Sequence, residues 1–159
     1  MPEYDHKLIE YVRGLDASGL QHNFSISAVR PPPDAEYENA AFFNFFIAGR
    51  NTGYATLIAD HEARYVQWIH FFPHSRKEGL ERRGIGTLAH VAAIRALVER
   101  ERPEPGFEVM HTSPTRNRLQ HMSAMGLRTS EPLRDYMGKS ISYANHRGFR
   151  FDNPFDWPR

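Results

Sequence analysis

Cysteine is absent from the 159-residue sequence. Its absence excludes disulfide bonds, thiolate nucleophiles and cysteine-based zinc sites together. A chain without cysteine suits a reducing compartment, so we expect a cytoplasmic protein. The nine histidines include no H-E-x-x-H pattern, and we expect no metal site.

Long apolar runs and an excess of charge of one sign are also missing. No apolar run approaches the roughly 18 residues that a membrane-spanning helix needs. Residues 1–15 (MPEYDHKLIEYVRGL) are charged and lack the apolar stretch of a signal peptide. The formal net charge of +1 argues against a general nucleic-acid-binding protein, which usually has a strongly basic balance. We therefore expect neither a membrane nor a nucleic acid as a partner.

Hydrophobic and aromatic residues, in contrast, make up 40% and 13% of the chain. This length and composition can fill one core, so we expect a single domain over residues 1–159. Apolar residues recur at helical spacing from Tyr4 to Leu15, which predicts an amphipathic helix. Alternating or aromatic-rich segments then predict four strands, with RNTG (50–53) as a hairpin turn: residues 22–30, 39–50, 54–60 and 65–72.

The second half of the chain mixes helices with strands. A largely apolar segment from Gly84 to Arg100 predicts a buried helix, although we expect its His90 at the surface. Ser113 followed by proline predicts the start of another helix, which stops at Gly126. Two further strands are predicted at residues 106–112 and 136–144.

The last segment, residues 147–159, is rich in aromatic side chains among prolines and charges. It either folds back over the core or forms the edge of a partner surface. Together these elements predict a mixed α+β domain around one sheet.

Residues 82–87 (RRGIGT) place two glycines at the start of the predicted buried helix. The first turn of a helix has unpaired N–H groups and a partial positive charge, which suit an anion. Glycines let the backbone approach that anion closely, and the sequence offers no structural need for both of them. The pattern therefore predicts a loop that binds phosphate or pyrophosphate.

Two common nucleotide-binding motifs fit this loop poorly. GIGTLA matches the G-x-G-x-x-A of dinucleotide-binding folds, but that motif needs a strand leading directly into its first glycine. Here the predicted strand ends at Pro73, eleven positions before Gly84. The P-loop pattern G-x-x-x-x-G-K-[ST] is not in the sequence.

ERRGIG (81–86) resembles the R/Q-x-x-G-x-G/A loop of the GNAT superfamily of acyl-CoA-dependent N-acyltransferases, with Glu81 departing from the first position. Three other stretches are similar to motifs of that family in the same order, and the resemblance covers residues 39–127: GYATLIAD (53–60), VQWIHFFP (66–73) and NRLQHMSAMGL (117–127). The resemblance implies a GNAT-like, mixed and mostly antiparallel sheet with flanking helices. It also implies a splayed strand pair, residues 66–72 and 107–112, at the cofactor cleft.

The resemblance implies transfer of an acetyl or other acyl group from coenzyme A to a primary amine of a small molecule or peptide. Acyl-CoA would be the co-substrate, and homodimers are common in the family. The implied cofactor-binding residues hold the pantetheine amide, the pyrophosphate and the pantetheine arm in turn: Phe71 and Phe72, then Arg82, Arg83, Gly84, Ile85, Gly86 and Thr87, and then Asn117.

The resemblance does not assign the proton donor directly, because Met122 occupies the position of the family's usual tyrosine acid. Candidate proton donors and acceptors nearby are His121, Tyr136 and Tyr143, with water as an alternative donor. His70 is the first choice as base because an imidazole titrates near neutrality, and His74 and His111 follow. The alternative for His70 is an ordinary half-buried strand histidine.

Two other functions remain open from the sequence. A non-catalytic module with the same fold would bind acyl-CoA or a protein partner, and Met122 slightly favours it. A longer acyl chain, or an acyl carrier protein as the donor, would suit the abundant phenylalanine, although core packing explains the same residues.

Overall fold

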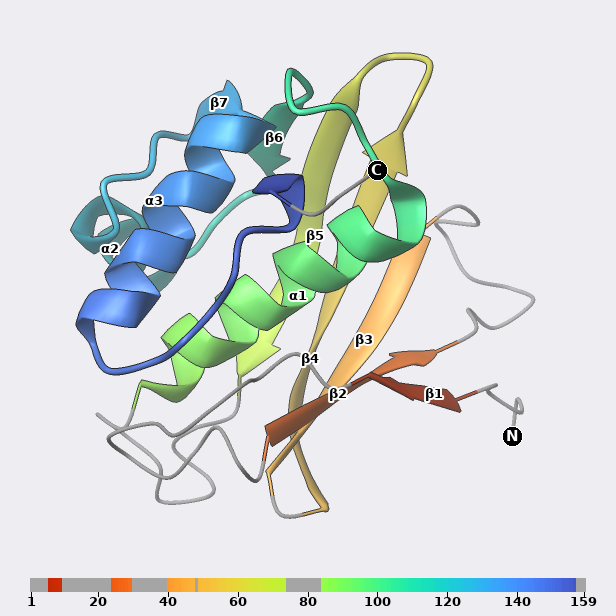
Figure 1. The fold of residues 1–159 in the computed structure, drawn as a ribbon, viewed down its shortest axis with the longest axis vertical. Helices are drawn as coiled ribbons and strands as arrows, with labels where there is room; N and C mark the ends of the chain where they lie inside the picture. Colours follow the sequence, from red (N-terminus) through yellow and green to blue (C-terminus); the bar gives the residue numbers. More distant parts are fainter. Residues whose placement is uncertain (1–5, 10–23, 30–39, 48, 74–83, 157–159) are drawn as a thin grey trace.

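A computed structural model describes residues 6–9, 24–29, 40–47, 49–73 and 84–156 of the chain (Figure 1). The described elements follow in this order: β1 (His6–Ile9), β2 (Phe24–Val29), β3 (Ala40–Ile47), β4 (Arg50–Asp60), β5 (Tyr65–Pro73), α1 (Ile85–Glu101), β6 (Glu108–His111), α2 (Arg116–Ala124), β7 (Ser130–Pro132), α3 (Leu133–His146) and a short 3-10 helix, η2 (Pro154–Asp156).

These strands form one seven-stranded sheet whose spatial order is the order of the sequence. Every neighbouring pair is antiparallel except β5 and β6, which are parallel and are joined by the crossover helix α1. The predicted α+β class and the mixed, mostly antiparallel sheet are therefore confirmed. None of the helices among the described residues is both long enough and apolar enough to cross a bilayer.

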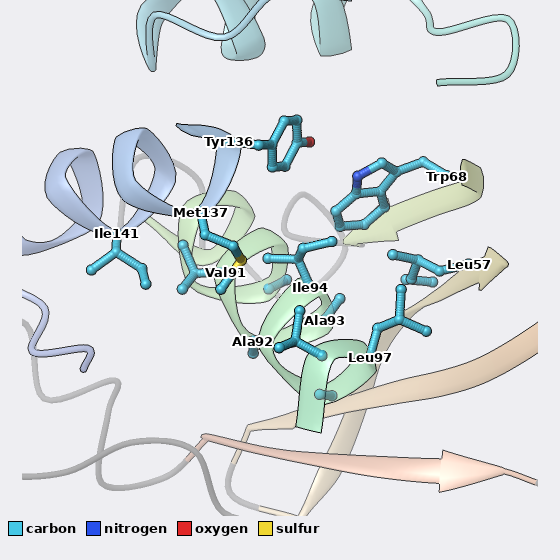
Figure 2. Close-up of a cluster of buried hydrophobic side chains, with 14 of the residues drawn as sticks. Leu57, Trp68, Val91, Ala92, Ala93, Ile94, Leu97, Tyr136, Met137 and Ile141 are labelled. Atoms are coloured by element: carbon cyan, nitrogen blue, oxygen red, sulfur yellow. The ribbon is translucent and has the colours of Figure 1, made fainter. Parts of the chain in front are cut away.

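The core lies between the sheet and the helices α1 and α3. Strand side chains alternate, so that Phe43, Phe45 and Leu57 are buried on the face that α1 covers. Helix α1 is buried around its whole circumference from Leu88 to Val98, as its apolar composition predicts. Figure 2 shows its side chains filling the space between the strand residues Leu57 and Trp68 and the α3 residues Met137 and Ile141.

The helix predicted from Tyr4 to Leu15 is wrong where the structure describes it. Residues His6–Ile9 form β1, which pairs antiparallel with β2. The exposed edge of β2 supplies backbone partners for these residues, and such pairing overrides a weak local helix propensity. The rest of that segment lies outside the described residues.

The strand predicted at 136–144 is also wrong, because these residues belong to α3. The buried side chains of α3 recur every three or four residues, which is the helical period: Leu133, Tyr136, Met137, Ser140, Ile141 and Ala144. The sequence carried this period, but small polar residues between the apolar ones imitated strand alternation. Strand β7 was not predicted, since three residues are too few to show a pattern.

Two boundaries differ from the sequence prediction, and a third agrees with it. The β3–β4 hairpin turns at Gly49, with Ile47 paired to Arg50, so RNTG begins the strand. Helix α2 is capped by Thr115 rather than by Ser113. The predicted stop at Gly126 is confirmed, since this residue has a φ of 77°.

The C-terminal tail, as far as residue 156, folds back over the core, which was one of its two predicted placements. Phe149 and Phe151 are buried, and Phe155 packs partly buried against the same core. The Asn145 amide fixes the turn, because it accepts from the Phe151 N–H at 2.8 Å and donates to the Phe151 carbonyl at 3.1 Å.

Candidate functional site

Strands β5 and β6 pair over only part of their length. Their register ends at Trp68↔His111, where the Thr112 N–H donates to the Trp68 carbonyl at 2.9 Å. Strand β5 continues to Pro73, and Figure 1 shows β6 beside only its first half. Among the described strands, none pairs with residues 69–73 on the side that β6 has left. We call residues 69–73 the unpaired half of β5.

A β-bulge sets which backbone groups face that open side. The register between β4 and β5 shifts by one residue, so that Ile69 is an extra residue between Trp68 and His70. Before the bulge, the backbone groups of Trp68 face β6. Because one residue is added, the groups that face away from β4 after the bulge are those of Phe71 rather than those of His70. The N–H and C=O of Phe71 therefore point to the open edge.

Helix α1 begins close to the same end of the sheet (Figure 1). Its N-cap, Gly84, has a φ of 81°, and no side chain caps the helix by a hydrogen bond. The ring of Phe149 lies only 3.0 Å from the position that a Cβ of Gly84 would take. Gly84 therefore has a structural reason that sequence reasoning missed: backbone conformation and close packing both require glycine there.

Gly86 is different, because the protein itself does not require glycine at this position. Among the described residues, a Cβ there would meet only His121, at an ordinary contact distance of 3.7 Å. The first turn of α1 also contains no acidic residue. As far as the described residues go, nothing at Gly86 prevents a close approach by an anion to the helix start.

A cluster of aromatic and imidazole rings lies around Trp68, in contact with Phe71 of the unpaired half of β5. Trp68 stacks on His90, with ring centres 5.1 Å apart, and on His111, with ring centres 5.8 Å apart. The Tyr136 hydroxyl lies 3.0 Å from His111 Nε2 and points toward the indole nitrogen of Trp68 (Figure 2). His90 Nε2 lies 3.0 Å from Ser140 Oγ. Strands β5 and β6 and helices α1 and α3 each contribute to this ring cluster.

Arg118 enters the ring cluster from the first turn of α2. Thr115 caps this helix by accepting from the Arg118 N–H at 3.1 Å, which fixes where the side chain leaves the helix. The guanidinium carbon lies 4.1 Å from the ring centre of Phe71 and 4.9 Å from that of Trp68. Nη2 donates to His90 Nδ1 at 2.7 Å, whereas Nε is buried and makes no hydrogen bond.

Arg118 is only 9% exposed, and no carboxylate among the described residues pairs with it. Burial lowers the pKa of Arg118 to about 10, so the guanidinium keeps its charge at neutral pH. Taking such a charge out of water costs several kcal/mol even after relaxation. A cation–π contact returns about 1–2 kcal/mol. The contacts with Phe71 and Trp68 therefore offset only part of the cost.

The three histidines around Arg118 are uncharged at neutral pH. Burial, with a smaller contribution from the charge of Arg118, lowers the pKa of His111 to about 3 and that of His121 to about 4. The pKa of His90 is also lowered, first by its complete burial and then by Arg118. None of these rings supplies positive charge to the site in the resting protein.

The N–H groups of Arg118 determine the tautomer of two of these imidazoles. Arg118 has only N–H donors, so the Nδ1 atoms of His90 and His121 that face it act as acceptors. The proton of each ring is then on Nε2, which donates to Ser140 Oγ in one case and to Thr87 Oγ1, at 3.1 Å, in the other. The contact of Arg118 with His121 is the longer one, at 3.4 Å.

Several predicted site residues come together here. Phe71 packs under Arg118, Thr87 and His121 join α1 to α2, and Tyr136 belongs to the ring cluster. Ile85 and Thr87 are themselves buried, so only their backbone groups are available to a ligand. Tyr143 lies at the margin, since its ring centre is 6.4 Å from that of His121 and its oxygen accepts from Arg147.

Other predicted site residues lie elsewhere. His70 is exposed rather than half-buried, and its ring contacts Tyr54 and Phe72 instead of the ring cluster. Phe72 and Asn117 are exposed. Met122 is buried in the core and offers no proton donor. Arg82, Arg83 and His74 lie outside the described residues.

Sequence reasoning missed His90 and Arg118. The prediction of a surface position for His90 is wrong, because it is completely buried. A signal existed: in a helix that is apolar all round, a histidine has no solvated face to occupy. No comparable signal marks Arg118, since α2 is short and largely exposed.

Among the residues that the structure describes, no three His, Asp or Glu side chains are arranged to hold a metal ion. Comparison of the chain with models of known families, with curated proteins and with solved structures found no match.

Proposed function

We propose that this protein is an acyl-CoA-dependent N-acyltransferase of the GNAT type, which transfers an acetyl or other acyl group to a primary amine. The observation that carries the proposal is the unpaired half of β5, with the backbone of Phe71 facing outward beside the glycine start of α1. This combination offers both a strand edge and a helix N-terminus to one ligand. It adds to the resemblance of residues 39–127 to that family.

The donor would use these two features together. The amides of its pantetheine arm would bond to the open edge of β5, as an added strand does. Its pyrophosphate would lie against the first N–H groups of α1, where Gly86 permits a close approach. Coenzyme A is thus a better fit than a nucleotide without such an arm.

The reaction is a direct transfer without a protein nucleophile. The nitrogen of a neutral amine attacks the thioester carbonyl, and the oxygen that gains negative charge accepts from the Phe71 N–H. The C–S bond then breaks, and the thiolate takes up a proton. His70, exposed on β5 next to Phe71, would remove the proton from the amine.

Tyr136 and Tyr143 remain the two candidates for protonating the thiolate. Burial raises the pKa of Tyr136, so this phenol keeps its proton at neutral pH, and it lies beside Trp68 of β5 (Figure 2). The oxygen of Tyr143 already accepts from Arg147 at 3.2 Å. We favour Tyr136.

Calorimetry with coenzyme A and acetyl-CoA, followed by free-thiol release with a panel of amines and peptides, tests the proposal. We expect micromolar binding and amine-dependent thiol release. No binding at high micromolar concentrations overturns it. Binding without turnover on a broad panel favours instead a non-catalytic acyl-CoA-binding module, for which the burial of Met122 in place of a donor is the supporting observation.

A further inference from the structure

We propose that Arg118 binds a carboxylate group of the substrate. This carboxylate would be the opposite charge that the buried guanidinium lacks within the described chain. The inference rests on the proposed function, because it concerns a ligand lying along the unpaired half of β5. The guanidinium stands over Phe71, whose backbone faces that edge, and its Nε makes no hydrogen bond.

The rest of the described chain shows how this fold treats other buried charges. Arg95, which is 2% exposed, forms an ion pair with Asp152. Glu131, which is 1% exposed, accepts from Lys139 Nζ at 2.8 Å and lies near Arg128. Arg118 alone among the buried charged side chains of the described residues has an uncharged histidine where the others have an opposite charge. The difference points to an anion supplied from outside the chain.

The surroundings favour a carboxylate over a phosphate. Phe71 and Trp68 form apolar walls on the guanidinium, and His90 and His121 are neutral, so Arg118 is the one charged group among the described residues of the ring cluster and its contacts. One guanidinium balances a monoanion but leaves a phosphate dianion partly uncompensated in a buried place. A planar carboxylate also matches the two parallel N–H groups that a guanidinium presents along its Nε edge.

Two parts of the reaction could bring this carboxylate. It is either the free end of a dicarboxylic acyl group on the donor or the carboxylate of an amino-acid acceptor. Assays on the wild-type protein alone can distinguish these two sources of the carboxylate. Binding of acetyl-CoA, succinyl-CoA and the monomethyl ester of succinyl-CoA is compared by calorimetry, and acetyl transfer is compared between amino acids and their amides.

If the acyl group brings the carboxylate, succinyl-CoA binds at least tenfold more tightly than its methyl ester. If the acceptor brings it, amino acids are used with a KM at least tenfold below that of their amides. Arg118→Met removes the preference in whichever arm shows it, and Arg118→Lys retains part of it. Arg116→Met, an exposed arginine of the same helix, is the matched control and leaves the preference unchanged.

The absence of any carboxylate preference in both arms overturns the inference, even if acyl transfer is observed. The inference is also overturned if Arg118→Met prefers the carboxylate ligands as strongly as the wild type does. If no coenzyme A derivative binds, the proposed function fails by itself. Thermal shifts with succinate, glutarate and N-acetylglutamate, set against their neutral amides, then test Arg118 alone, and no stabilisation by the acids rejects the site.

Discussion

The guanidinium carbon of Arg118 lies 4.1 Å from the ring centre of Phe71, and this contact joins the start of α2 to the unpaired half of β5. Through His90 and His121 the same side chain also reaches α1. One buried cation on α2 therefore contacts both β5 and α1. Its energetics, its neutral histidine neighbours and the glycines of α1 lead to five predictions.

Replacing Arg118 by Met should leave the free energy of unfolding unchanged or raise it by about 1–4 kcal/mol, because an uncompensated buried charge is exchanged for an apolar side chain of similar length. Asp152→Asn should act in the opposite direction and lower stability by about 1–3 kcal/mol, since it removes a charged partner of buried Arg95. Urea unfolding at pH 7.5 measures both. A large loss of stability in Arg118→Met would mean that its charge is already satisfied within the fold.

Stability should fall steeply as the pH drops from about 6.5 toward 4. His90, His111 and His121 have lowered pKa values in the folded protein, the last two at about 3 and about 4. The unfolded chain binds protons at these residues near pH 6.5 while the folded protein does not, so acid favours unfolding. Each such residue adds up to about 1.4 kcal/mol per pH unit to the slope.

The measurement is urea unfolding at several pH values between 7.5 and 4.5. His121→Asn should reduce the slope by up to one proton, whereas His146→Asn, an exposed position on α3, should not change it. A stability that stays flat between pH 6.5 and 5 contradicts the prediction.

Gly86→Ala should separate ligand binding from folding. Among the described residues a Cβ at this position meets only His121, at 3.7 Å, and alanine favours a helix by up to about 1 kcal/mol over glycine. The variant should therefore be at least as stable as the wild type but bind coenzyme A at least tenfold more weakly, because the methyl group blocks the close approach. Gly138→Ala in α3, where a Cβ meets open space, is the control and should bind normally. If Gly86→Ala binds coenzyme A as tightly as the wild type, the pyrophosphate does not lie at the start of α1.

Gly84→Ala should instead damage the fold. Its φ of 81° costs a non-glycine residue about 1–2 kcal/mol, and the added Cβ lies 3.0 Å from the Phe149 ring. Thermal or urea unfolding should show a loss of at least that amount. The double variant Gly84→Ala, Phe149→Leu should lose less than the sum of the two single variants, because the smaller side chain relieves the clash. Simple additivity would show that the ring contact does not matter.

The catalytic assignments predict a split between turnover and binding. His70→Asn and Tyr136→Phe should each lower kcat by about 10²–10⁴-fold while coenzyme A binds as before, because each removes a proton-transfer group. Tyr143→Phe should have a small effect, since Tyr143 lies at the margin of the site. Thiol release and calorimetry on the same samples provide the two readouts. If only Tyr143→Phe lowers turnover, then Tyr143 rather than Tyr136 protonates the thiolate.

Much of the fold follows from local patterns in the sequence. Strands β2 to β6 and helix α1 were predicted because alternation, apolar periodicity and the prolines and glycines at their ends are properties of short segments. The helix-ending role of Gly126 and the glycine start of α1 were visible for the same reason. These features also carried the resemblance on which the proposed function depends.

The other features depend on contacts between distant segments. Strand β1 exists because β2 offers it an edge, and β7 is a strand only by its pairing with β6. The extra residue Ile69, which turns the Phe71 backbone outward, follows from the register of β5 against β4. The burial of Arg118 is the clearest case. The sequence placed it at the start of a short, polar helix, and only the meeting of α1, α2 and β5 took its charge out of water.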